Sequence, residues 1–153
     1  MLPPVVWEWL NDPKKRAQWA HAEVVFIPVA LPGGRTGVGA RTHCVHGKNV
    51  AMVETVLDWR PFDYFTVEQV FGPFTERATF RLTPAPGGTH LHVYERGRMT
   101  SLEFLDRLIF SFMMTKVQLT TKLLELMGQR IAEDLAREPA VEASGAQVAE
   151  GMS

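Results

Sequence analysis

The fold is decided by residues 100–137, which read TSLEFLDRLIFSFMMTKVQLTTKLLELMGQRIAEDLAR. Thr100 and Glu103 have the spacing of a capping box, in which two side chains satisfy the first N–H groups of a helix. The helix should end by Glu138, because Pro139 disfavours helical geometry in the residue before it. At 1.5 Å per residue it would be roughly 50 Å long. An apolar stripe with helical spacing runs along it, formed by Leu105, Leu108, Ile109, Phe112, Leu119, Leu123, Leu126, Met127 and Ile131.

The chain ahead of this helix predicts two short helices followed by strands. Pro3 and Pro4 suit the start of the first helix, and Asp12 caps the second with a proline at its first position. We interpret the basic residues 14–16 as a solvated corner. Short connections imply antiparallel pairing, so we expect an α+β fold in which a curved sheet packs its apolar face on the long helix. The segments with strand character are 24–29, 40–46, 50–59, 64–71, 75–83 and 89–99.

The composition limits the class of protein. A chain of 153 residues suits one domain, which we place at 1–137, with the small and polar stretch 138–153 as a disordered tail. The net charge of -1 gives no electrostatic case for binding nucleic acid or an anionic membrane. Cys44 is the one cysteine, which excludes an internal disulfide. No signal peptide and no membrane-spanning run is visible in the sequence, so we expect a cytoplasmic protein.

Four segments resemble the SRPBCC superfamily, which has the START-like helix-grip fold. They are the first helix at 4–13, a glycine-rich strand entry at 37–41, a strand end at 56–61 and the final hairpin at 80–91. The resemblance covers residues 3 to about 135. It implies a sheet of six or seven strands wrapped around the C-terminal helix, with an apolar cavity between them. Members of the superfamily bind lipids, sterols, hormones or polyketides, and some are cyclases or aromatases.

One departure from the superfamily pattern concerns the start of the chain. A strand usually precedes the first helix, whereas only Met1 and Leu2 precede it here. Either the start codon is misplaced or the sheet lacks an edge strand. In the second case the strand at 24–29, or its neighbour, has an open edge that invites pairing with another chain.

Strand alternation predicts which polar side chains point toward the long helix. It places Glu54 there, and the long helix adds Lys116, near the middle of its apolar stripe. These two residues are the most informative, because a buried charge is costly unless it is paired. Either they pair in the cavity and orient the polar end of a ligand, or Lys116 reaches the cavity mouth and Glu54 faces solvent after a register shift. The predicted ligand-binding residues are Glu54, Lys116, Gln69, His46, Glu95, Met52, Phe65, Val67, Phe80, Phe112 and Leu119.

The other reactive residue types form no recognisable catalytic or metal set. His43 and His46 fall on opposite faces of one strand, and His90 and His92 share a face that should be the outer one. Their spacing does not converge on a metal, so we predict neither a metal nor another cofactor. Cys44 has no activating partner in the sequence and is expected to be a buried small hydrophobe.

Three functions remain open at this point. Our leading hypothesis is a non-catalytic module that binds a small hydrophobic ligand such as a lipid or a polyketide-like molecule. The enzyme alternative is a cyclase or dehydratase in which Glu54, His46 or Lys116 acts as acid or base. The third is an interaction module whose missing edge strand comes from a partner. Phe110 and Met114 point away from the apolar stripe, which suits a homodimer surface or a lid but is also compatible with no role.

Overall fold

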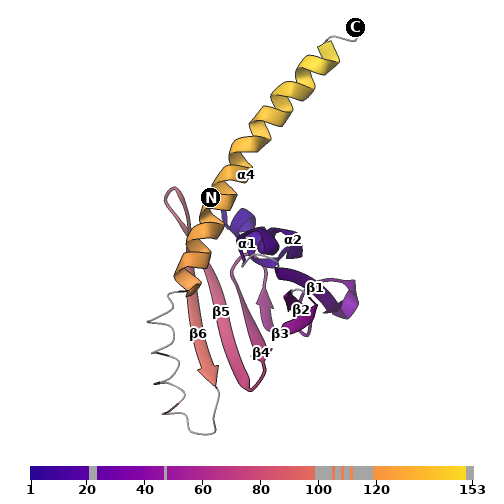
Figure 1. Cartoon of the computed structure of the whole chain (residues 1–153). Helices are drawn as coiled ribbons and strands as arrows, with labels where there is room; N and C mark the ends of the chain where they lie inside the picture. Colours follow the sequence, from indigo (N-terminus) through magenta and orange to yellow (C-terminus); the bar gives the residue numbers. More distant parts are fainter. Residues whose placement is uncertain are drawn as a thin grey trace.

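The computed structural model describes residues 1–20, 24–46, 48–98 and 119–150, together with the helical positions 105, 108 and 111. For residues 46, 50, 51, 119 and 138–150 it describes the backbone alone. The chain forms an α+β helix-grip fold, as predicted (Figure 1). Within the described ranges, no helix combines the length and the hydropathy needed to cross a membrane.

Two short helices open the chain and lie against one face of the sheet. They are α1 (Pro3–Asn11) and α2 (Pro13–Trp19). Asp12 separates them and caps α2, since its carboxylate accepts hydrogen bonds from the backbone N–H groups of Lys14 and Lys15, both at 2.9 Å. Trp19 fixes the pair by donating its indole N–H to the carbonyl oxygen of Trp9 at 3.0 Å.

Six antiparallel strands follow in the order in which they occur along the chain. The sheet order is β1-β2-β3-β4-β5-β6, which confirms the predicted meander. A short 3-10 turn at Pro32–Gly34 connects the first two strands. The bounds are β1 (Val24–Ala30), β2 (Arg41–His46), β3 (Asn49–Arg60), β4 (Tyr64–Phe71), β5 (Phe74–Ala85) and β6 (Gly88–Arg98).

Bulges in β3 break its strict alternation. The pairing of β2 with β3 skips Ala51, and the pairing of β3 with β4 skips Leu57. A bulge bends its strand and increases the local twist, which helps a sheet curve around other elements. The second bulge leaves Leu57 on the outer face and pairs Trp59 with the buried Phe65. The ring of Trp59 packs edge-on against that of Trp7, with ring centres 4.8 Å apart.

The sheet, the two short helices and the C-terminal helix share one hydrophobic core. The C-terminal helix α4 (Leu119–Glu150) contributes Met127 and Ile131, which are 4% and 1% exposed. Lys15 of α2 adds ion pairs to Glu8 at 3.1 Å and to Asp134 of α4 at 3.7 Å. The remaining buried members of this core are Val6, Trp7, Trp9, Leu10, Trp19, Ala40, Val56, Phe65, Val67, Ala78 and Leu82.

The long helix departs from the prediction in two respects. It does not end by Glu138, since α4 continues through Pro139 to Glu150 and extends beyond the rest of the molecule (Figure 1). The predicted stripe is buried at Met127 and Ile131, but Leu105 and Leu108 are 41% and 61% exposed. Helical spacing shows that apolar residues share a side, but it does not show which surface that side meets. The domain boundary at 137 and the disordered tail stay predictions.

The sheet has β1 and β6 as its outer strands, so the predicted edge position of the first strand is correct. Pro28 lies within β1 and has no N–H to offer a neighbouring strand, and the register shifts between Pro28 and Ala30. A proline and a bulge are two common ways of making an edge strand a poor template for further pairing. These features weigh against the interaction-module interpretation.

Candidate functional site

A row of polar side chains crosses the inner face of the sheet, the face that the helices cover. Thr42 of β2 pairs with Glu54 of β3, Glu54 with Gln69 of β4, and Gln69 with Glu76 of β5. Glu95 of β6 pairs with Ala78, two residues from Glu76, and is therefore a diagonal neighbour of Glu76 on the same face. We call Glu54, Gln69, Glu76 and Glu95 the polar row.

The first member of the row, Glu54, is buried and forms an ion pair with Arg16. Its carboxylate oxygens accept hydrogen bonds from both terminal nitrogens of the Arg16 guanidinium, from Nη1 at 2.6 Å and from Nη2 at 2.9 Å. Gln69 donates a third hydrogen bond, from Nε2 at 2.8 Å. Burial alone would raise the pKa of Glu54, but Arg16 and these hydrogen bonds outweigh it and lower the pKa below 4.5. Glu54 is therefore an ionised, fully engaged carboxylate.

Arg16 extends from α2 to the polar row, where its guanidinium lies between the Phe26 ring and the Glu54 carboxylate. Its guanidinium carbon is 4.2 Å from the centre of the Phe26 ring, a cation–π contact with β1. Burial acts to lower the pKa of Arg16, yet the Glu54 carboxylate reverses this and raises the pKa. Its Nε finds no hydrogen-bond partner within the described part of the chain.

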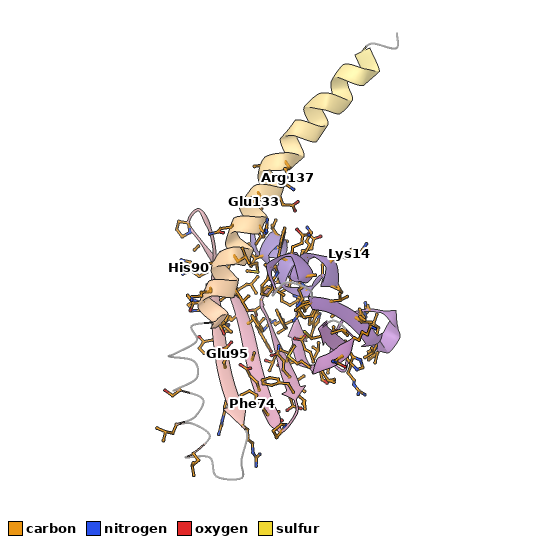
Figure 2. All side chains as sticks on the ribbon, viewed as in Figure 1. Lys14, Phe74, His90, Glu95, Glu133 and Arg137 are labelled. Carbon is orange, nitrogen blue, oxygen red and sulfur yellow. The ribbon has the colours of Figure 1, made fainter. Side chains whose placement is uncertain are left out.

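Glu76 and Glu95 form the other half of the row and have a different character. Burial and, secondarily, the charge of Glu95 raise the pKa of Glu76 to about 7. Burial also raises the pKa of Glu95, although the hydroxyl of Thr120 on α4 donates a hydrogen bond to its Oε1 at 2.9 Å. Figure 2 shows Glu95 on β6, close to the first turn of α4. Near neutral pH this end of the row therefore holds a carboxyl group that exchanges its proton readily.

Aromatic side chains flank the polar row on both sides along the strands. Phe65 and Phe80 stack with ring centres 4.8 Å apart and an interplanar angle of 10°. Phe71 and Phe74 form a second pair, with ring centres 4.5 Å apart, where β4 turns into β5. Figure 2 labels Phe74 at this end of the sheet. A few polar groups set between apolar walls are typical of sites for hydrophobic small molecules.

The structure brings together part of the set predicted from the sequence. Glu54 and Gln69 are hydrogen-bonded, and Phe65 is stacked on Phe80. Val67 is buried in the main core, Met52 packs on the smaller cluster of Val24, Phe26 and Cys44, and Glu95 bonds to α4. His46 and Leu119 lie in β2 and α4 with only their backbone described. Lys116 and Phe112 lie outside the described residues, as do Phe110 and Met114.

Two corrections concern charged residues. Arg16 is not part of a solvated basic corner, because its side chain is 14% exposed and carries the counter-charge of Glu54. The alternative in which Glu54 faces solvent is wrong, since the residue is 5% exposed. The predicted pair of Glu54 with Lys116 stays untested, but both carboxylate oxygens already have partners on α2 and β4.

Sequence reasoning missed Arg16, Glu76 and Thr120, although two of them left a signal. Arg16 lies three residues before the buried Trp19, which places both on one side of a helix. Glu76 lies two residues before Ala78, and the alternation of Ala78, Phe80 and Leu82 with polar residues in the sequence indicates the face that they share with Glu76. Thr120 gave no such signal, because a threonine on a helix is usually unremarkable.

The remaining reactive residues do not gather into a site. His90 and His92 are exposed on the outer face of β6, as predicted, and Figure 2 shows His90 near the β5–β6 hairpin. No group of three metal-binding side chains comes together among the described residues. Burial raises the pKa of the Cys44 thiol, which favours its unreactive protonated form.

The raised pKa of Glu76 predicts that stability falls as the pH rises from about 5 to 8. The native carboxyl keeps its proton to about pH 7, whereas the unfolded one releases it near 4.5. Between these values unfolding releases a proton, so a higher pH favours the unfolded chain. We expect a loss of about 1–2 kcal/mol after allowing for solvent screening, measured by urea unfolding at both ends of the range.

The Glu76→Gln variant should show a flatter profile over the same pH range. Glu68→Gln provides the matched control, since it neutralises a carboxylate on the outer face of β4 and should leave the loss in place. Equal pH profiles for the wild type and Glu76→Gln would contradict the assignment.

The fold and the polar row agree with the result of comparing the sequence with models of protein families. A family model described as polyketide cyclase / dehydrase and lipid transport matches residues 3–118. The chain belongs to this family. The resemblance to the SRPBCC superfamily is thereby confirmed. A comparison with curated proteins finds no match.

Solved structures share the fold of this family member at low sequence identity. A protein of Rhodobacter sphaeroides aligns with a TM-score of 0.62 and 14% identity over 86% of each chain. A protein of Mesorhizobium loti gives 0.57 and 22% over 84% of this chain and 90% of its own. CalU16 of Micromonospora echinospora gives 0.54 and 18% over 95% of this chain and 80% of its own. At these identities the similarity establishes the fold alone.

Proposed function

We propose that the protein binds a small hydrophobic ligand, lipid or polyketide-like, between the inner face of the sheet and the C-terminal helix. The observation that carries this proposal is the polar row, half-buried at Gln69, Glu76 and Glu95 and bordered by two aromatic pairs. Stable cores rarely keep several carboxyl groups on the inner face of a sheet without a reason. The family description, which includes lipid transport, supports the same function. The cytoplasmic location and the homodimer stay predictions.

Native mass spectrometry of protein purified without detergent is the first test. We expect a fraction of the protein to carry a co-purified hydrophobic molecule, whose mass would identify its class. In solution, the uncharged apolar dye N-phenyl-1-naphthylamine should gain fluorescence on binding and be displaced by long-chain amphiphiles. A protein that carries no small molecule and does not bind the dye would contradict the proposal.

Matched variants locate the bound dye. Phe80→Ala removes half of an aromatic pair on the inner face, whereas Tyr94→Ala removes an exposed ring from the outer face of β6. We expect the first to weaken dye binding about tenfold, which is the effect of roughly 1.4 kcal/mol of lost contact, and the second to leave it unchanged. Equal effects of the two changes would place the dye elsewhere.

A second candidate function is cyclase or dehydratase chemistry, and one observation favours it. A carboxyl group with a pKa of about 7, such as Glu76, is suited to general acid or base catalysis at neutral pH. Glu54 is a poor candidate for that role, since Arg16 and Gln69 occupy its oxygens. Loss of water from a short poly-β-keto thioester, followed by mass spectrometry, tests this function. Glu76→Gln should abolish such turnover while dye binding remains.

A further inference from the structure

The side-chain amide of Gln69 is held in one orientation. An ionised carboxylate only accepts hydrogen bonds, so the amide group that faces Glu54 must be the nitrogen, as the 2.8 Å contact from Nε2 shows. The carbonyl Oε1 of Gln69 is on the other branch of the same planar amide and points away from Glu54. Among the residues that the structure describes, none donates a hydrogen bond to this oxygen.

Glu76 lies beside this acceptor on the neighbouring strand. It is the direct partner of Gln69 in the antiparallel pairing of β4 with β5, and such partners have Cβ atoms about 4.5–5.5 Å apart. Two neighbouring carboxyl groups in a half-buried place do not ionise together easily, so one of them keeps a proton. Thr120 donates a hydrogen bond to Glu95 and so favours the ionised form there, which leaves the proton with Glu76.

The charges that the described elements supply around this pair disfavour an anion. The inner-face charges supplied by the described elements are Glu54 on β3, Arg16 on α2, and Glu76 and Glu95 themselves. Arg16 is the cation among them, and both of its terminal nitrogens bind Glu54. A carboxylate placed beside Glu76 would meet Glu95 without a compensating positive charge from these elements.

We propose that Gln69 and Glu76 bind a hydroxyl group at the polar end of the ligand and reject a carboxylate. A hydroxyl fits both partners, because its oxygen accepts from the Glu76 carboxyl and its hydrogen is donated to Gln69 Oε1. A ketone satisfies Glu76 alone, and a carboxylate has no hydrogen for Gln69. Arg16 and Glu54 are positioning residues, which act by fixing the Gln69 amide. This inference rests on the proposed function.

The test compares three probes of equal chain length, 1-dodecanol, 2-dodecanone and dodecanoate, in displacement of N-phenyl-1-naphthylamine at pH 6.5. We expect dodecanol to displace the dye at the lowest concentration and dodecanoate to need at least about tenfold more, because a buried polar group left unpaired weakens binding strongly. Equal potency of dodecanol and dodecanoate in the wild type would overturn the inference and leave the binding function intact. Failure of every probe to bind would overturn both.

Variants assign the preference to its residues. Gln69→Leu and Glu76→Leu should each lower the ratio of dodecanol to dodecanoate affinity, leaving only the preference that comes from the higher cost of burying a carboxylate. Glu76→Gln, which replaces the O–H donor of the carboxyl with an N–H donor, should retain more of the ratio than Glu76→Leu. Glu68→Gln on the outer face is the control and should leave the ratio unchanged. A ratio that stays the same in both leucine variants would overturn the assignment.

A separate measurement tests the positioning role of Arg16 and Glu54. The double change Arg16→Met with Glu54→Leu removes both buried charges and frees the Gln69 amide to rotate. We expect this protein to lose most of its preference for the alcohol, measured as the ratio of the dodecanol and dodecanoate affinities, so that a change in dye affinity common to both probes cancels. A merely structural pair would leave the head-group preference intact, so a wild-type ratio in the folded double variant would contradict this role.

Discussion

Glu54→Leu alone should lower the free energy of unfolding by about 3–5 kcal/mol, as measured for buried pairs that lose one partner. The change leaves the Arg16 guanidinium buried against Phe26 without its counter-charge, and it also removes the acceptor for Gln69. Arg16→Met should cost a similar amount, because it leaves the Glu54 carboxylate in the same place. Urea unfolding followed by tryptophan fluorescence measures both.

The double variant separates the cost of an unpaired charge from any net benefit of the pair. Arg16→Met with Glu54→Leu should recover most of the loss, since apolar side chains of similar volume often replace a buried ion pair at little cost. The exposed pair of Arg77 with Glu68, at 3.4 Å, is the control, and breaking it should cost less than about 1 kcal/mol. Single variants that are as stable as the wild type would show that the pair is accessible to water.

The same pair predicts how stability responds to acid. The pKa of Glu54 is lowered in the folded protein, so its contribution is complete above about pH 4.5 and is lost as the pH falls through the folded value. The double variant should lack this part of the acid-induced loss. Glu76 acts in the opposite direction and over a different range, above about pH 5, so the two carboxyl groups are distinguishable in one pH series.

Local patterns in the sequence predict most of the sheet. Alternating apolar residues and short turns identify six strands in their correct order, and the same alternation places Glu54 and Gln69 on the inner face. These rules succeed because one face of the sheet is buried and a strand has a side-chain period of two. They lose accuracy at Ala51 and Leu57, where an extra residue enters β3 and nothing in the local sequence marks it.

The partner of Glu54 was not predictable from the same rules. A positive charge on a short helix is usually solvated, and the orientation of α2 over the sheet is decided by tertiary packing. The clue available in the sequence was Trp19, a large aromatic residue three positions after Arg16 and therefore on the same side of a helix. The raised pKa of Glu76 likewise depends on tertiary structure, first on burial and then on Glu95, a residue 19 positions away that the pairing of β5 with β6 brings close.

The end of the long helix shows a local rule that did not hold. Proline removes one backbone hydrogen bond and disfavours helical geometry just before it, which predicted a stop at Glu138. In the structure α4 passes through Pro139 to Glu150. The fixed φ of proline is itself compatible with a helix. Alanine and glutamate residues on both sides of Pro139 favour the helix, and together they oppose the effect of the single proline.

Ile131→Ala should lower the free energy of unfolding by about 2–4 kcal/mol, the range for a large-to-small change in a packed core. Ile131 is 1% exposed and shares a core with side chains of α1, α2 and the sheet. Leu135, one turn later on the same helix, is 40% exposed, so Leu135→Ala is a matched control that should cost less than about 1 kcal/mol. Urea unfolding again provides the measurement. Ile131 and Leu135 lie on the same side of the helix, so similar losses in both variants would mean that the packed part of α4 extends one turn further than the exposure of Leu135 indicates.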